Sequence, residues 1–412
     1  MQAAVSSLAC PAATGVQAYT GWGGFTPKAV LFLGNRRTTN GGESQSAAAN
    51  NSMSQCILGM MDGVNSGCLH DTDDFTAGDV RFDGTGNVIT IAHGPSTPVS
   101  IQAAFSAFAA GSFSLNWGVV TSGVIVNYMV LGGGDLSASI ISDTLPTATG
   151  NKALSGAGFT PAGAILIGGN NFSGTTGTIL GGGAIGFVKD GNSRASISSN
   201  YGDGSWSTNP GVTGFTNGFG RYTRTDKAYA EVYANAKRYE GDFVSMDASG
   251  LTLNFATVPT ATGSLIRALC LGGISVAVGS LNQRTSNGNT VVATGFPVRA
   301  LIIMSIIKTN GTTIDTAALS WCTGMSDGTN SSCISSISGT NGVGYMDRTH
   351  VYAKMADSTA TTPAASATVT FGYGDFTLAF DATDATATEI QYIALGDSIG
   401  GAFTPHRMPL GV

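Results

Sequence analysis

The sequence predicts an all-β protein made of three tandem, antiparallel β-sandwich-like domains that arose by internal triplication. Two observations support this prediction: similar apolar segments recur three times in the same order, and alternating segments typical of strands accompany them. The recurring segments begin at Gly24, Gly158 and Gly295, so their starts lie 134 and 137 residues apart. A spacing of that size matches a whole domain and is too long for a solenoid repeat.

The first recurring element is an opening strand that contains a glycine, a phenylalanine and a proline at its start. A near-continuous apolar run follows, which is typical of a central strand covered on both faces. We therefore expect the three phenylalanines to be buried anchors at equivalent positions. The opening segments are Gly24–Gly34, Gly158–Gly168 and Gly295–Met304, and their frame residues are Phe25, Pro27, Phe159, Pro161, Phe296 and Pro297.

Two further elements close each unit. An alternating segment places apolar residues at every second position, so that one face points inward and the other outward. A second apolar segment follows, and because it resembles the opening one, we expect the two to be neighbours in a sheet. The alternating segments are Phe113–Trp117, Leu251–Phe255 and Phe376–Phe380, and the closing segments are Val124–Gly133, Leu265–Gly273 and Glu389–Asp397.

An Asp-Gly pair marks the middle of the first and third units. It predicts a hairpin with a type I′ turn, because that turn needs positive φ at both central positions. These matched hairpin tips are our candidate contact loops for a partner, and ordinary solvent-facing turns fit the pattern equally well. The candidate residues are Asp62, Gly63, Asn65, Asp327, Gly328 and Asn330; the second unit keeps a reduced form of the motif at Asp190–Ser193.

The second unit has an aromatic loop of its own, which contains Tyr201 and Trp206. An exposed tryptophan in such a loop would stack on a sugar or a protein partner, and packing inside the unit is the alternative. The same unit carries charges of mixed sign between Arg221 and Asp242, a pattern that predicts a solvated helix or strand face.

The recurrences also divide the chain into domains. Segments near Ile140–Gly156 and Ser275–Thr294 are predicted to be linkers. The predicted divisions are an N-terminal arm at 1–20, β repeats at 21–140, 150–275 and 290–398, and a C-terminal tail at 399–412.

Composition excludes several functional classes. Charged residues make up 11% of the chain and hydrophobic residues 42%, which is the reverse of a disordered protein. A net charge of −6 with 19 basic residues argues against direct binding of nucleic acid, which needs clustered cations. No apolar stretch is long enough for a membrane span. Small neutral residues suit surfaces that other protein subunits cover, because charge is depleted at the centre of interfaces.

We expect no cofactor, no metal ion and no catalytic site. The histidines and cysteines lack the spacing of metal ligands. Cysteine pairs flank the Asp-Gly motif in two units, at Cys56 with Cys68 and at Cys322 with Cys333; we favour free thiols, with a disulfide brace as the alternative. Ser398 follows a Gly-Asp pair as in some hydrolases, but it lies at a strand exit without a recognisable base and orienting group.

The recurring frame resembles a loosely defined family of tailed-bacteriophage structural proteins. The resemblance rests on the opening segments and on the closing motifs, namely Tyr128–Gly133, Leu265–Gly273 and Tyr392–Gly396. It covers all three units, but only at their strand ends, and the third unit departs from it with Pro297 one position early and Asp397 in place of the final glycine. The resemblance implies a component of a virion surface rather than an enzymatic activity.

The sequence therefore predicts a non-enzymatic virion structural protein, assembled in the host cytoplasm, whose leading role is capsid cement or decoration. The expected partners are other virion proteins and further copies of this chain, with no nucleic acid and no membrane. The alternative is a tail or fibre component that contacts host surface glycans through the second unit. A glycan-active or hydrolytic enzyme is the remaining class, and it would need a catalytic constellation.

Overall fold

The computed structural model describes residues 1–44, 55–74, 77–92, 99–169, 181–202, 218–233, 236–259, 264–308, 313–314, 320–337, 343–356 and 361–398. These residues form strands and connecting turns without a helix, and every strand pairing is antiparallel. Six sheets result, two for each of three similar units. The predicted fold class, an all-β chain with triplicated sandwich domains, is confirmed.

Unit 1 comprises the first eleven strands. Ten of them build its two sheets, in the orders β1-β11-β3-β5-β6-β7 and β2-β10-β9-β8. The eleventh, β4, crosses to unit 3 and pairs with β27 at the edge of that unit's larger sheet. The strands are β1 (Gln2–Ala9), β2 (Gly15–Thr20), β3 (Pro27–Asn35), β4 (Gly41–Ser44), β5 (Gln55–Met61), β6 (Ser66–Asp74), β7 (Ala77–Asp83), β8 (Asn87–Ala92), β9 (Val99–Ala109), β10 (Ser112–Val119) and β11 (Ile125–Gly132).

Unit 2 repeats this topology, with the sheet orders β12-β21-β14-β15-β16-β17 and β13-β20-β19-β18. Its strands are β12 (Ser137–Thr144), β13 (Gly150–Ser155), β14 (Gly163–Gly169), β15 (Gly181–Asp190), β16 (Ser193–Gly202), β17 (Gly218–Arg224), β18 (Tyr229–Tyr233), β19 (Ala236–Asp247), β20 (Gly250–Thr257) and β21 (Leu265–Gly272).

Unit 3 repeats it again, with the orders β22-β31-β24-β25-β26-β27 and β23-β30-β29-β28. The opening and closing strands are neighbours in all three units, as predicted. The strands of unit 3 are β22 (Ser275–Asn282), β23 (Gly288–Ala293), β24 (Val298–Ser305), β25 (Ser320–Ser326), β26 (Ser331–Ile337), β27 (Val343–Asp347), β28 (Tyr352–Met355), β29 (Pro363–Phe371), β30 (Asp375–Ala382) and β31 (Glu389–Gly396).

The segments predicted to be an arm and two linkers are strands, which corrects the predicted domain boundaries. The first strand of each unit pairs with the closing strand, and the second pairs with the alternating strand. These edge strands are rich in small or exposed residues, so they lack the apolar pattern that identifies a central strand; all six residues of β2 are exposed or half-buried. Unit 1 therefore begins with β1, and units 2 and 3 begin with β12 and β22.

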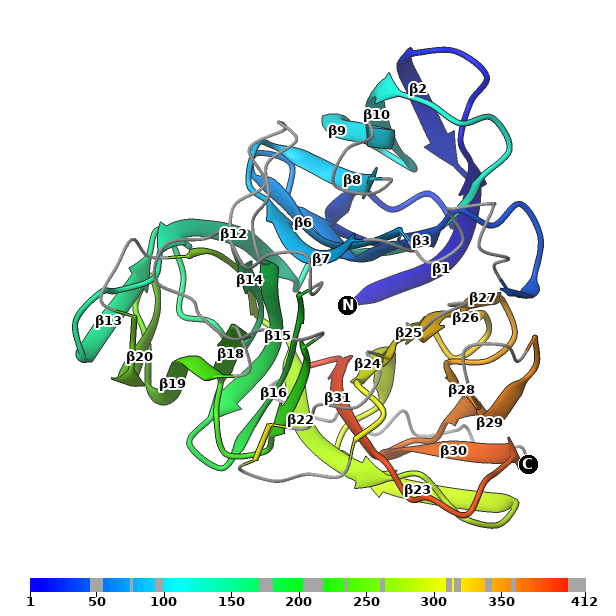
Figure 1. Ribbon diagram of the computed structural model, residues 1–412. Helices are drawn as coiled ribbons and strands as arrows, with labels where there is room; N and C mark the ends of the chain where they lie inside the picture. The colour runs from blue at the N-terminus through cyan, green and yellow to red at the C-terminus, as the bar shows by residue number, and fades with distance from the viewer. Residues whose placement is uncertain are drawn as a thin grey trace, which may run out of the picture.

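The three larger sheets surround one central core (Figure 1). Each larger sheet turns one face to this core and the other to its own smaller sheet, so its central strands are covered on both sides, as the sequence predicted. The alternating strands bury one face only, also as predicted. Equivalent positions of the opening strands illustrate the central core: Leu31, Ile165 and Ile302 meet there, while Phe32, Leu166 and Ile303 face the separate sandwich cores.

The phenylalanine that recurs at the start of each unit has a direct structural reason. Each ring covers a glycine near the end of the closing strand, where a Cβ atom would lie 2.5–2.6 Å from the ring. The pairs are Phe25 with Gly132, Phe159 with Gly272, and Phe296 with Gly396. Only Phe296 is fully buried, whereas Phe25 and Phe159 are half-buried, so the prediction of three buried anchors holds for position but only in part for burial.

Candidate interaction loops and the joints between the units

The Asp-Gly motifs form the tips of the β5–β6 and β25–β26 hairpins. Gly63 and Gly328 have φ angles of 94° and 85°, while the residues after them keep negative φ. The turns therefore have positive φ only at the first central position, as in a type II′ turn rather than the predicted type I′. Each glycine also lies against a phenylalanine ring of the smaller sheet, where a Cβ atom would be 3.0 Å from Phe108 at Gly63 and 2.6 Å from Phe371 at Gly328.

Both hairpin tips bind the next unit of the same chain. The carboxylate of Asp62 accepts a hydrogen bond from the backbone N–H of Ile140 in β12, and the Asn65 amide donates to the Ile140 carbonyl at 3.0 Å. The equivalent Asp327 accepts from the Val5 N–H in β1 at 2.7 Å. These bonds cap the outer edges of β12 and β1, which would otherwise present unpaired backbone groups. The predicted contact loops thus serve contacts within the chain.

The remaining predicted contact residues are placed differently. Asn330 is exposed, and so is Val64 at the other hairpin tip, which was not among the predicted contacts and has 85% of its surface accessible. Tyr201 lies in β16 opposite Phe219. Trp206 lies outside the described residues, so the aromatic loop predicted for unit 2 stays a prediction.

A polar residue occurs at the same position of each closing strand, on the face that looks toward the neighbouring unit. Asn127, Arg267 and Gln391 each pair with a serine of the first strand, namely Ser7, Ser142 and Ser280 respectively. They mark the three contact regions between neighbouring units, which we call joints. Gln391 lies between units 2 and 3, Arg267 between units 1 and 2, and Asn127 between units 3 and 1.

Arg267 fills the joint between units 1 and 2. Its guanidinium donates to the backbone carbonyl of Ser66 at 3.4 Å and to that of Gly84 at 3.1 Å, and it lies over the Phe82 ring. Burial lowers the pKa of Arg267 because the charged form loses solvation. The side chain therefore joins the two units through bonds to carbonyls and through its contact with an aromatic face.

Gln391 fills the joint between units 2 and 3. Its amide nitrogen has acceptors within hydrogen-bonding distance at the carbonyls of Ser196 (3.1 Å) and Arg224 (2.9 Å), at the Thr223 hydroxyl (2.8 Å) and at the Glu389 carboxylate (2.8 Å). Thr223 also donates to Glu389 at 2.9 Å. Burial raises the pKa of Glu389, and the bonds from Gln391 and Thr223 oppose that rise.

Several of the mixed charges of unit 2 are buried, which corrects the prediction of a solvated face for those residues, namely Arg221, Arg224, Glu231 and Glu240. Glu231 is fully buried and receives bonds from Arg238 at 3.2 Å, Tyr229 at 2.8 Å and Ser264 at 3.0 Å. Burial raises the pKa of Glu231 despite these partners. The reason is tertiary: Glu231 lies in β18 of the smaller sheet, and strands of the larger sheet pack against β18, on the face that the sequence pattern assigned to water.

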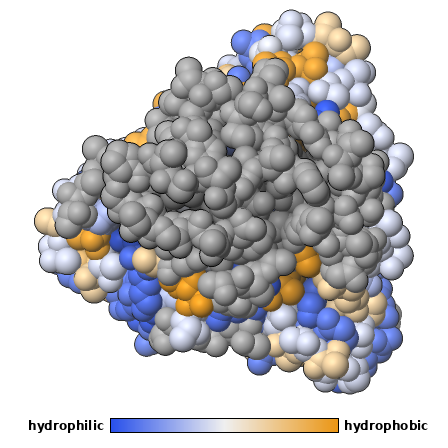
Figure 2. Space-filling view, viewed as in Figure 1, coloured by the Kyte–Doolittle hydropathy of each residue, from blue (hydrophilic) through white to orange (hydrophobic). Residues whose placement is uncertain are grey.

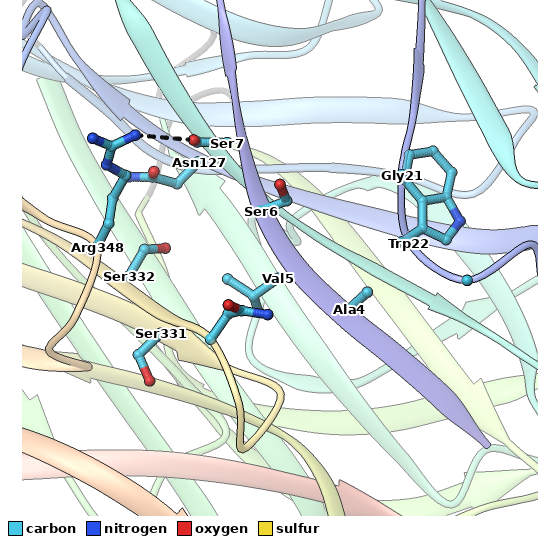
Figure 3. Close-up of a pocket in the computed structure, with 12 residues that line it drawn as sticks. Ala4, Val5, Ser6, Ser7, Gly21, Trp22, Asn127, Ser331, Ser332 and Arg348 are labelled. Carbon is cyan, nitrogen blue, oxygen red and sulfur yellow. Dashed lines mark hydrogen bonds between the residues drawn. The ribbon is translucent and has the colours of Figure 1, made fainter.

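Asn127 differs from its two counterparts. It is fully buried, and within the described chain neither atom of its amide has a hydrogen-bond partner. A pocket of about 380 Å³ opens beside it, between β1 of unit 1 and the β25–β26 hairpin of unit 3 (Figure 3). Arg348, Ser332 and Ser7 also line the pocket, and Arg348 reaches the Ser7 hydroxyl at 3.5 Å.

Other groups of potential chemical interest have structural partners. Asp397 of the hydrolase-like motif pairs with the N-terminal amine at 2.8 Å and with Arg299 at 2.8 Å. The cysteines are free and buried, and burial together with the neighbouring Cys56 thiol raises the pKa of Cys68. The same causes raise the pKa of Cys333 beside Cys322. These environments favour the unreactive thiol form.

In unit 3, His350 lies between two carboxylates. Its ring nitrogens are 2.9 Å from Asp347 and 2.7 Å from Asp381. The bond to Asp347, with a smaller contribution from Asp381, raises the pKa of His350 to about 9. The imidazole is therefore protonated at neutral pH and donates to both carboxylates.

Comparisons with known proteins add no relative: neither models of known protein families nor curated protein sequences gave a match. Over the described ranges, no group of three or more histidine, cysteine or acidic side chains is arranged to hold a metal ion. No helix in the described part of the chain is long and apolar enough to cross a membrane.

The three polar residues at the joints were not predicted from the sequence, although the sequence contains a signal for them. Each closing strand is nearly continuous in apolar residues but carries a polar residue at the same place, at Asn127, Arg267 and Gln391, and the third strand has Glu389 in addition. A polar side chain in a strand covered on both faces needs a partner. Alignment of the three closing strands would have pointed to this position.

Proposed function

We propose that this chain is a non-enzymatic structural protein of a tailed-bacteriophage particle, attached to the capsid as a cement or decoration protein. The observation that supports this best is the arrangement of three units of one topology around one shared core. A chain of this kind presents three similar outer faces around one axis. It therefore suits a threefold or quasi-threefold position of a symmetric shell. The resemblance of the strand-end motifs to those of tailed-bacteriophage structural proteins supports a place in a virion.

The outer edges of the smaller sheets are the contact surfaces that fit this role. Each begins at an edge strand, β2, β13 or β23, which among the described residues has a neighbouring strand on one side only, so that its other side is open to a partner strand. Val16 in β2 and Val291 in β23 are 65% and 63% exposed, which is high for valine. Figure 2 shows the triangular outline of the molecule, and small hydrophobic and hydrophilic patches lie side by side at its rim.

A tail or fibre component that contacts surface glycans is the second candidate. The polar pocket beside Asn127 favours it, because a capsid cement protein needs no pocket for a small molecule. The two roles predict different places for the chain on the particle.

Purified particles that contain this chain provide the test. We expect imaging to place the chain on the capsid at threefold or quasi-threefold positions, with the β2, β13 and β23 edges against the shell. We also expect the chain to stay attached in a high-salt wash, because its contacts are mainly apolar and hydrogen-bonded. Density for the chain on the tail, or release at moderate salt, would contradict the capsid role, and absence of the chain from purified particles would contradict both roles.

A further inference from the structure

The joint between units 3 and 1 contains an open pocket beside Asn127, at the position that the Arg267 and Gln391 side chains fill in the other two joints. Its volume of about 380 Å³ lies within the usual range for small-molecule sites. Its walls come from β1 and the Gly21–Gly23 segment of unit 1, and from the start of β26 and Arg348 of unit 3 (Figure 3). Asn127 is shorter than Arg267 and Gln391, so it does not reach across the joint.

Two buried polar side chains line this pocket without partners. Asn127 is 0% exposed and Ser332 is 2% exposed, and the described residues offer no hydrogen bond to the Asn127 amide or to the Ser332 hydroxyl. Both groups can donate and accept. A buried polar group without a partner is unfavourable, so a ligand that supplies hydroxyl groups here would relieve an existing cost.

The pocket also carries a positive charge that no lining carboxylate neutralises. Arg348 donates to the neutral oxygens of Asn40 at 2.8 Å and Ser7 at 3.5 Å. None of the residues that line the pocket is acidic. The neighbouring Asp327 is occupied by bonds from the backbone N–H groups of Val5, Thr329 and Asn330.

We propose that this pocket binds a small organic carboxylate of the size of one sugar acid. The carboxylate pairs with the Arg348 guanidinium and accepts from the Ser7 hydroxyl, and hydroxyl groups of the ligand satisfy Asn127 and Ser332. A guanidinium suits this task because its donors match the geometry of a carboxylate and the resulting bonds are charge-assisted. This binding function goes beyond a structural role in a particle and does not depend on it.

The test is ligand binding to the full-length protein, measured by calorimetry and by saturation-transfer NMR. The probes are D-glucuronate, D-gluconate and lactate, with D-glucose as a neutral ring and sulfate as an anion without a ring. We expect saturable binding of glucuronate, and binding weaker by roughly tenfold or more for glucose, because glucose lacks the charge-assisted bonds. Sulfate is expected to compete poorly.

Three variants locate the site. Arg348→Gln removes the charge at an exposed position and is expected to weaken glucuronate binding roughly tenfold or more. Asn127→Arg fills the pocket and is expected to abolish binding, with a melting curve to verify folding. Arg299→Gln is the matched control, since Arg299 is an exposed arginine paired with Asp397, and binding should be unchanged.

The proposal is overturned if none of the three carboxylates shows saturable binding. It is equally overturned if binding survives Arg348→Gln unchanged, or if sulfate competes as well as the carboxylates do.

Discussion

The joint between units 2 and 3 and the joint between units 3 and 1 occupy equivalent places in one repeated fold, yet their interiors differ. In the first, Gln391 lies among four acceptors and joins strands of both units. In the second, the side-chain amide of Asn127 has no hydrogen-bond partner within the described chain, and a pocket occupies the space across from it. Each joint is encoded by its own residues because the three units belong to one chain. One joint can therefore change while the other two hold the units together, which three identical separate subunits could not do.

The difference also suggests why an unfavourable residue persists. A buried amide without a partner lowers stability, and proteins retain such features most often where function requires them. Asn127 would then be kept for the pocket, and Arg267 and Gln391 for the cohesion of the units. The following predictions test this division.

The largest effect is expected for Gln391→Leu, which keeps the volume but removes the donor shared by Glu389, Thr223 and two carbonyls. We expect a loss of about 3 kcal/mol in the free energy of unfolding, because buried acceptors and a carboxylate lose their partner. Chemical denaturation measures the change. The matched variant Asn127→Leu should be neutral or stabilising by up to about 1 kcal/mol, because no bond is lost there. Equal losses in the two variants would remove the distinction between the joints.

The next effect concerns the hairpin tips. Asp62→Ala removes the carboxylate that accepts from Ile140 in the next unit and from Val64 and Asn65 in its own turn, and we expect a loss of about 2 kcal/mol. Asp190→Ala is the control, because Asp190 bonds only to Asn192 of its own turn among the described residues, and its loss should be about 0.5 kcal/mol. A small effect at Asp62 would instead favour a solvent-facing turn.

A smaller effect is expected from pH, and it distinguishes unit 3 from unit 1. Asp347 of unit 3 is held by His350, whereas the equivalent Asp83 of unit 1 is held by neutral groups such as Thr85 and Thr90. The pKa of His350 is raised from 6.5 to about 9, so its stabilising contribution is complete below about pH 6.5 and is lost as the pH rises through about 9.

We expect this loss to be about 1 kcal/mol, since the site is partly exposed to solvent. Unfolding measured across that pH range checks it. The His350→Gln variant should show a flatter profile, and an identical slope in both proteins would contradict the assignment.

The sequence predicted those features that depend on contacts within one unit. The alternation at Phe113–Trp117 and the apolar runs around Leu31 and Ile165 identify strands and their neighbours, because periodicity reports which face is covered. The first strands were missed because β1 and β2 contain mostly small or exposed residues. An edge strand is specified by backbone pairing with its neighbour, which a hydrophobic pattern does not reveal.

The hairpin-tip contacts and the pocket were harder to predict, because each of them forms between residues of two different units. Asp62 and Asp327 were recognised as hairpin tips, but the strands they bind lie 78 and 322 residues away in the sequence. Arg348 and Asn127 meet only because the three units close around one core. A pattern within one segment contains no information on which segment packs against it.

The most direct measurement for the comparison of the joints is the free energy of unfolding of Asn127→Gln relative to the wild-type protein. Glutamine is longer by one methylene, and in the equivalent joint it reaches the carbonyls of the neighbouring unit. We predict an increase of about 1 kcal/mol, as the amide gains partners across the open joint. A decrease would contradict the account, because it would mean that the longer amide finds no partner across the open joint.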